Sequence, residues 1–183
     1  MRPTDVVFRY TNFLTDHEKT EIHNYDTVFY LNLKEEKKNK AQPDVFCNEK
    51  GEFNVNVGEH IKFRYEILEK LGMGSFGVVL KCVDHKTKEF VGVKVLRNEE
   101  RFHRQGKVEV RILTRLNKVD ERDKKNVVRM FDYFYFRGHL VSVSARATPP
   151  LPSVSRSSSS ASTSTRSLSL TSSGYEVRVF NRA

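Results

Sequence analysis

The sequence has no tryptophan, only two cysteines and no apolar run of membrane-spanning length. Cys47 and Cys82 lie too far apart in sequence to indicate a disulfide framework or a metal-binding cluster. The chain shows no signal sequence, and a membrane span would need about 20 consecutive apolar residues. We therefore expect a protein of the cytosol, with the nucleus as the alternative, that has no membrane segment and no metal site.

The chain is basic, with a formal net charge of +9 over 183 residues. Residues 141–183 contribute five arginines against one acidic residue, whereas charges of both signs alternate over residues 1–140. Interleaved charges are typical of an ordinary solvated surface. The arginines of the tail are widely spaced and have almost no aromatic residues between them, so we do not expect nucleic-acid binding.

Residues 72–77 read Gly-Met-Gly-Ser-Phe-Gly, a G-x-G-x-x-G motif shared by dinucleotide-binding folds and protein kinases. A dinucleotide-binding fold would begin a helix at Gly77, but residues 78–83 are rich in valine and predict a strand. A Walker phosphate loop is excluded because Val78 stands where that motif needs lysine. The motif therefore predicts a hairpin between two strands, as in kinases, and the alternative is a glycine hairpin without a ligand.

Lys94 lies seventeen residues after Gly77, inside the apolar run 90–96. An unpaired ammonium group would be costly there, so we expect an anion nearby. In kinases the partners are nucleotide phosphates and a glutamate on the following helix. We predict that helix at residues 101–118, where Ile112, Leu113 and Leu116 place Glu109 at the edge of the apolar face. Glu109 is the predicted partner of Lys94; the alternative is a solvated carboxylate.

Residues 63–140 resemble the N-terminal lobe of dual-specificity tyrosine-regulated kinases, the DYRK family of the CMGC group. The resemblance rests on six stretches: Arg64-Tyr65-Glu66-Ile67-Leu68, Gly74-Ser75-Phe76-Gly77, Asp84-His85-Lys86-Thr87, residues 97–105 (RNEERFHRQ), Glu109-Val110-Arg111-Ile112-Leu113 and residues 134–140 (FYFRGHL). The RNE-x-RFHRQ stretch favours the cytosolic branch of the family. The resemblance implies an α+β fold, with a twisted five-stranded antiparallel sheet and one main helix.

Residues 12–62 resemble the accessory box that precedes the kinase domain in this family, and residues 1–11 form an N-terminal extension to it. Thr15-x-x-Glu18 is a capping box that predicts a short helix. Residues 27–33 predict a strand, and residues 45–57 predict a short strand pair. By resemblance the box supports the kinase domain structurally and offers a surface for a protein partner.

The chain departs from the family at two glycines and in its tail. Gly92 stands where the family has alanine, and Gly106 lies inside the predicted helix at an intrinsic cost of about 1 kcal/mol. After Leu140 the family continues into an apolar strand, whereas residues 141–183 contain fourteen serines and predict disorder. The sequence contains no His-Arg-Asp or Asp-Phe-Gly motif. We interpret this break as a frameshift, a retained intron or a truncated gene model.

The resemblance implies a site for ATP, which the intact family enzymes use with magnesium, and identifies no catalytic or metal-binding residue in this chain. The nucleotide-contacting residues it implies are Leu71, Gly72, Met73, Gly74, Ser75, Phe76, Gly77, Val79, Gly92, Lys94, Glu109 and Val128. We therefore expect a fragment of an ATP-dependent Ser/Thr/Tyr kinase that binds ATP weakly and cannot phosphorylate alone. The alternative is a non-catalytic N-lobe module that binds a kinase or a regulator.

The composition break after Leu140 predicts where proteases will cut. Limited trypsin digestion should cleave first at Arg146, Arg156 or Arg166 and leave a core that begins within the accessory box and ends between Leu140 and Ala145. Mass spectrometry of the early products gives the boundary. Protection of residues 157–173 against digestion or amide exchange would contradict the frameshift interpretation.

Overall fold

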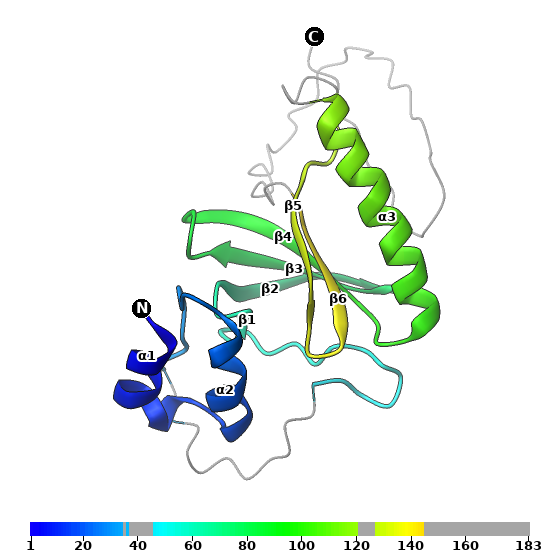
Figure 1. Cartoon of the computed structure of the whole chain (residues 1–183). Coiled ribbons are helices and arrows are strands. Elements are labelled where there is room, and N and C mark those ends of the chain that lie inside the picture. The colour runs from blue at the N-terminus through cyan, green and yellow to red at the C-terminus, as the bar shows by residue number, and fades with distance from the viewer. Residues whose placement is uncertain (35, 37–45, 121–126, 145–183) are drawn as a thin grey trace, which may run out of the picture.

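A computed structural model of the chain describes residues 1–34, 36, 46–120 and 127–144 (Figure 1). The helices are α1 (Pro3–Tyr10), α2 (Asp16–Glu21) and α3 (Glu100–Val119), with short 3-10 turns η1 (Thr11–Phe13) and η2 (Ile22–Asn24). The strands are β1 (His60–Ile61), β2 (Tyr65–Gly74), β3 (Gly77–Asp84), β4 (Glu89–Leu96), β5 (Met130–Phe136) and β6 (His139–Ser144). None of the described helices is long and apolar enough to span a bilayer.

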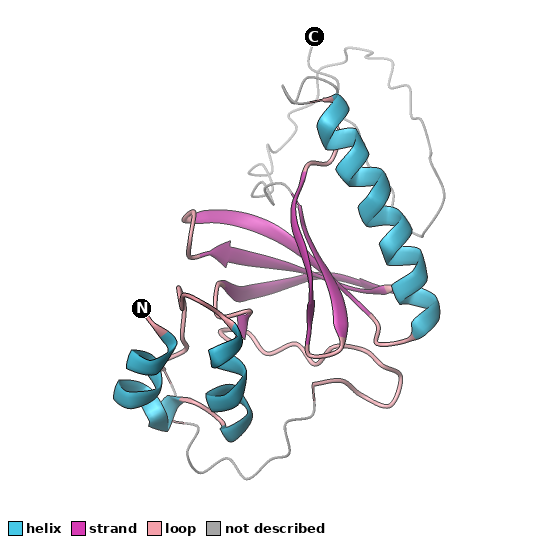
Figure 2. Ribbon diagram, in the orientation of Figure 1, coloured by secondary structure: helices cyan, strands magenta, loops and turns pink. Residues whose placement is uncertain are grey.

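The predicted α+β fold is confirmed. The strands form one antiparallel sheet in the order β1-β2-β3-β4-β6-β5, and α3 crosses one side of it while α1 and α2 lie near its β1 end (Figure 2). The five expected strands are β2 to β6, and the two-residue β1 adds a sixth. Of the predicted tail, residues 141–144 lie in β6, and residues 145–183 lie outside the described part of the chain.

The core of the sheet follows from the alternation along β3 and β4. Alternate residues of these strands are buried, in agreement with the period of two that predicts a strand. They join residues of the neighbouring strands in one cluster, whose members from β3, β4 and β6 are Val78, Leu80, Cys82, Val91, Val93, Val95, Val141 and Val143. Because one face is buried and mostly apolar, the register of the pairing is fixed.

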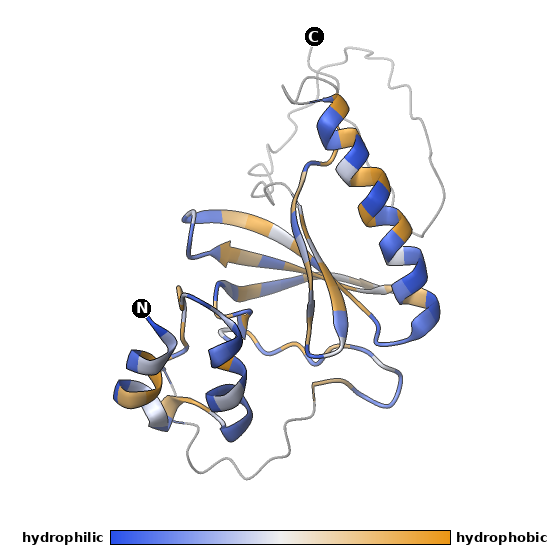
Figure 3. Ribbon diagram, viewed as in Figure 1, coloured by the Kyte–Doolittle hydropathy of each residue, from blue (hydrophilic) through white to orange (hydrophobic). Residues whose placement is uncertain are grey.

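Helix α3 packs on the sheet through Phe102, Gly106 and Val110, which are its buried residues. Ile112 and Leu116, which define the predicted apolar face, are 54% and 37% exposed and do not belong to this buried stripe. The buried stripe was missed because its middle position is a glycine, which adds nothing to an apolar pattern. Figure 3 shows polar and apolar residues alternating along the exposed helix.

The glycine at 106 has a packing reason. A Cβ there would lie 2.8 Å from the Cδ2 of Leu140 and would also meet the Cδ1 of Leu96. Its absence lets the helix backbone approach β4 and β6 closely. This close packing offsets part of the intrinsic cost of a glycine in a helix. The contacted atoms are the flexible ends of leucine side chains, which could shift.

The accessory region folds around its own small core. The predicted capping box is confirmed, because the Thr15 hydroxyl accepts from the Glu18 N–H at 3.2 Å and the Glu18 carboxylate accepts from the Thr15 N–H at 2.9 Å. The buried core residues are Val6, Leu14, Ile22, Val28 and Phe63. Helix α1, in the segment expected to be an extension, therefore contributes to this core.

Two predicted strand features of the accessory region did not form. Residues 27–33 make no ladder, because the N–H groups of Phe29 and Tyr30 both donate to one carbonyl, that of Phe63. In the described part of residues 45–57 there is one isolated bridge, between Cys47 and Phe53. Both segments are held by backbone bonds to separate neighbours, such as the mutual pair of Met1 and Val28 and the bond from the Asn98 N–H to the Gly51 carbonyl. Period-two patterning cannot distinguish such a segment from a strand.

A buried charged cluster joins the accessory region to the sheet. Arg137, in the turn between β5 and β6, donates to Glu21 at 2.8 and 3.2 Å and to Glu18 at 3.5 Å. Burial alone would lower the pKa of Arg137, but the hydrogen bonds and charges of the two glutamates raise it above the ordinary value. The guanidinium also stacks over the ring of Phe46, 4.2 Å from its centroid.

His60 completes this cluster as a neutral donor. The Phe63 N–H donates to its Nδ1 at 3.2 Å, so the ring proton resides on Nε2, which donates to a Glu18 oxygen 3.0 Å away. The rings of His60 and Phe63 stack with centroids 3.8 Å apart. Glu18 thus receives bonds from its own cap, from His60 and from Arg137.

His139, the first residue of β6, is fully buried. Its Nδ1 lies 2.7 Å from the Leu96 carbonyl oxygen and therefore holds the proton. Its Nε2 has no partner within the described chain. Burial lowers the pKa of His139, the Leu96 carbonyl opposes that shift, and the nearby His103 adds to it.

We expect the substitution Arg137→Met to destabilise the chain by about 3–5 kcal/mol, because it leaves two buried carboxylates without their cation. Urea denaturation measures the change. Adding Glu21→Gln to that variant should recover part of the loss. Arg104→Met is the control, since it removes an exposed pair with Glu100, and its effect should stay below about 1 kcal/mol. A loss that small at Arg137 would contradict the role of the cluster.

The buried neutral imidazole of His139 predicts loss of stability in acid. Its folded pKa lies below the unfolded value of 6.5, so the unfolded state binds the proton more readily, and stability falls as the pH drops below 6.5. The slope can reach about 1.4 kcal/mol per pH unit. Thermal melts from pH 7.5 to 5.5 should show this slope, and His139→Gln should reduce it. An equal slope in both proteins would contradict the assignment.

Candidate nucleotide site

The glycine motif forms a tight hairpin between β2 and β3. Gly74 pairs with Gly77, so that Ser75 and Phe76 form the two-residue tip. The predicted strand–loop–strand arrangement is therefore present. The carbonyl of Phe76 accepts from the Arg97 N–H at 3.0 Å, and its ring meets that of Phe102 edge-on with centroids 5.6 Å apart. The tip is thus held against the first turn of α3, a contact that the sequence did not predict.

Gly77 and Gly72 differ in why they are glycine. Gly77 has φ +149°, and a Cβ there would collide with the Val95 carbonyl oxygen, so the close pairing of β3 and β4 requires glycine. Gly72 has no such need, because a Cβ there would meet nothing within 4 Å. The structure leaves open space above Gly72, on the side where a ligand could approach the backbone.

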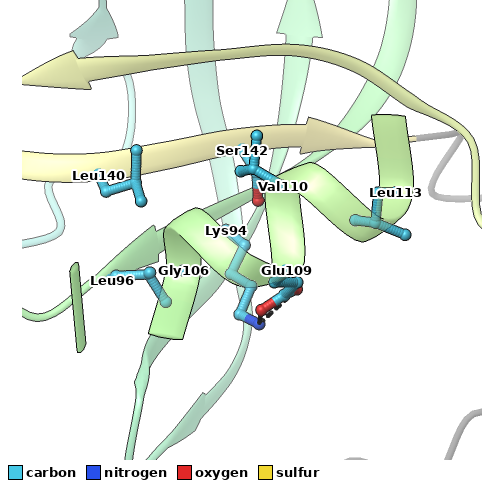
Figure 4. A pocket seen from close by; sticks show the side chains of 8 residues that line it. All are labelled: Lys94, Leu96, Gly106, Glu109, Val110, Leu113, Leu140 and Ser142. Atoms are coloured by element: carbon cyan, nitrogen blue, oxygen red, sulfur yellow. Dashed lines mark hydrogen bonds and ion pairs between the residues drawn. The ribbon is translucent and has the colours of Figure 1, made fainter. Parts of the chain in front are cut away.

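Lys94 and Glu109 lie in direct contact. The lysine Nζ donates to both carboxylate oxygens, at 2.9 and 2.8 Å (Figure 4). Lys94 comes from β4 and Glu109 from α3, so the pair fixes the helix to the sheet. The cavity beside the pair, which Gly106 and Ser142 also line, measures about 10 Å³ and is too small for more than about one water.

The register places several of the predicted contact residues on one face. Gly72 pairs with Val79, Val79 with Lys94, and Lys94 with Ser142, so these four form a cross-strand row. Gly92 lies two residues before Lys94 on the same face. Ser142 was not predicted; the alternation of residues 140–144 would have indicated it.

The remaining predicted contact residues form an open boundary. Leu71 and Val128 are 49% and 42% exposed, and Met73 and Ser75 are also exposed. Val128 lies before β5, outside the cross-strand row. A planar ligand laid on Val79 and Gly92 would therefore be covered from one side by the described residues.

The described residues suit the phosphate end of a nucleotide. Backbone N–H groups of a glycine hairpin beside an ammonium group are the usual arrangement around phosphate oxygens. Within the described ranges no three His, Cys, Asp or Glu side chains gather as a metal site would require.

Comparison with known proteins agrees with this geometry. Residues 65–151 match the protein kinase domain family. The chain is 40% identical over 146 residues to the DYRK-family kinase pom1 of Schizosaccharomyces pombe. It is 43% identical over 135 residues to human dual specificity tyrosine-phosphorylation-regulated kinase 4. Over this region the chain is similar to protein kinases of the DYRK family.

The matched region covers 76% of this chain for the fission-yeast kinase and 71% for the human one. It covers 13% and 26% of those two proteins, and 17% of the similar kinase mbk-2 of Caenorhabditis elegans, which is 41% identical over 142 residues. The chain thus spans about a quarter or less of the length of these relatives. The matched region is therefore a fragment of a protein kinase. The described sheet and α3 correspond to a kinase N-lobe.

Proposed function

We propose that this chain binds the phosphates of ATP weakly, between the glycine hairpin and Lys94, and transfers no phosphate by itself. The observation behind the proposal is the open space above Gly72, beside a lysine already oriented by Glu109. A fold that needed only a hairpin would tolerate a side chain at that position. A ligand that approaches the backbone would not.

The residues divide the work of binding between them. N–H groups of the hairpin would point at phosphate oxygens, and Lys94 would supply a positive charge to them. Glu109 holds the lysine ammonium at a fixed place on the sheet, which lowers the entropy lost on binding. Val79 and Gly92 would contact the base. ATP supplies the transferable phosphoryl group, and this chain would hold its phosphates in a fixed position.

Affinity should be low because the site is half open. Ligand sites usually bury most of the surface of their ligand, whereas Leu71 and Val128 are exposed and no described residue faces them. Transfer should be absent because kinases position the acceptor hydroxyl with an Asp of a His-Arg-Asp loop and magnesium with an Asp-Phe-Gly motif. Neither motif occurs in this sequence.

The accessory region supports a second proposal, that it binds a protein partner in the cytosol. Phe8 on α1 is 88% exposed although its neighbour Val6 lies in the accessory core. A protruding aromatic side chain on a rigid helix is typical of an interface anchor. The Arg137 cluster would hold that helix layer at a fixed place against the sheet.

The nucleotide proposal predicts opposite behaviour at two glycines. Gly72→Ala should leave the melting temperature unchanged or higher and weaken binding of a fluorescent ATP analogue by about tenfold, since the added methyl occupies ligand space. Gly77→Ala should lower the melting temperature, because its Cβ would collide with backbone. Fluorescence titration and thermal melts measure the two effects.

Lys94→Met should weaken analogue binding by a similar factor of about ten, and Lys86→Met, an exposed turn lysine, is the charge-matched control. Normal affinity in both Gly72→Ala and Lys94→Met would rule out the proposed site. Labelled phosphate transferred from ATP to a basic protein substrate by the wild-type chain, and lost in Lys94→Met, would refute the proposed lack of activity.

A further inference from the structure

An open groove of about 670 Å³ runs between α3 and β5, on the flank of the helix away from Glu109. At 100° per residue, Lys107 and Arg111 lie about half a turn around the helix from Glu109. The groove shares Val110 and Leu140 with the small cavity beside Lys94, but its other lining residues differ from those of that cavity. Its volume is in the range of ligand sites, which is about 300–1,000 Å³.

One wall of the groove is a row of cations. Lys107, Arg111, Arg115 and Lys118 all line it and are all exposed. Their spacing places them on one helix flank over about 16 Å of its length. None of the four forms an ion pair with a residue in the described ranges, although Arg101 and Arg104 on the same helix do.

The opposite wall and the floor are aromatic and apolar. Tyr133 and Tyr135 of β5 line the groove and are about half exposed, and His103 contacts the Tyr135 ring with centroids 5.5 Å apart. Val110 and Leu140 form the buried floor. The groove thus joins four positive charges, without ion pairs in the described ranges, to an apolar base. This is the complement of an acidic segment with an apolar side chain.

We propose that this groove binds an acidic peptide segment of a partner protein, with an apolar side chain between its carboxylates. An extended peptide rises about 3.4 Å per residue, so about five residues would match the row of cations. Arginine binds carboxylates through two parallel hydrogen bonds, and the tyrosine hydroxyls can donate to others. A polynucleotide backbone would match the charge but has no side chain for the Val110 and Leu140 floor.

The test uses the full chain and a fluorescein-labelled peptide of sequence Glu-Glu-Phe-Glu-Glu, with fluorescence anisotropy as the readout. The peptide should bind, and a Gln-Gln-Phe-Gln-Gln peptide should bind about tenfold more weakly or not at all. The double variant Lys107→Gln and Arg111→Gln should weaken binding of the acidic peptide by about tenfold. Both positions are exposed, so its melting temperature should equal that of the wild type.

The control removes the same charge elsewhere, by Lys86→Gln and Lys88→Gln in the turn between β3 and β4, and should retain wild-type affinity. Equal loss in both double variants would show general charge attraction and overturn the proposal. Equal binding of the acidic and the Gln peptides would also overturn it. So would a single-stranded oligonucleotide that binds the groove more tightly than the acidic peptide at the same salt. Tyr135→Ser should weaken binding of the acidic peptide without altering the salt dependence of that binding.

Discussion

The structure depends on the burial of Arg137 between Glu18 and Glu21, which are 119 and 116 positions away in sequence. A buried cation of this kind is stable only while all its partners are present, because each charge lost leaves another uncompensated. The accessory helix α2 and the β5–β6 turn must therefore form together. His60 of β1 and Phe63, just after it, add a stacked pair at the same place, so β1 joins the same unit.

The β5–β6 turn also helps to fix the positions of Lys94 and Glu109 in the candidate nucleotide site. His139 follows the turn and bonds to the Leu96 carbonyl, and Leu140 packs against the backbone of α3 at Gly106. Strand β6 then pairs with β4, where Lys94 lies opposite Ser142. Glu109 meets Lys94 because α3 rests on Leu96 and Leu140. The accessory region is thus a support for the Lys94–Glu109 geometry, although it lies far from it in the sequence.

The sequence predicted what depends on local pattern and missed what depends on distant partners. The glycine hairpin, the capping box at Thr15 and the helix with Glu109 each have a short-range signature, and each is present in the fold. The strand at residues 27–33 failed because its N–H groups share one carbonyl, a tertiary fact with no local signal. Arg137 was not recognised because one arginine in a turn resembles any surface charge until its buried partners are known.

The glycines at 72, 77 and 106 differ in what an added side chain would meet. At 77 a side chain would strike backbone, and at 106 it would strike leucine ends that can shift, so both residues serve packing, the first more strictly. At 72 nothing in the described chain opposes a side chain, and a β-branched residue would strengthen the strand. Neither a steric clash nor a positive φ therefore accounts for glycine at this position, which adjoins the register shift between Lys70 and Gly72. The proposed nucleotide would give such a glycine a use, because it would approach the hairpin from outside, next to a lysine whose ammonium is already fixed by Glu109.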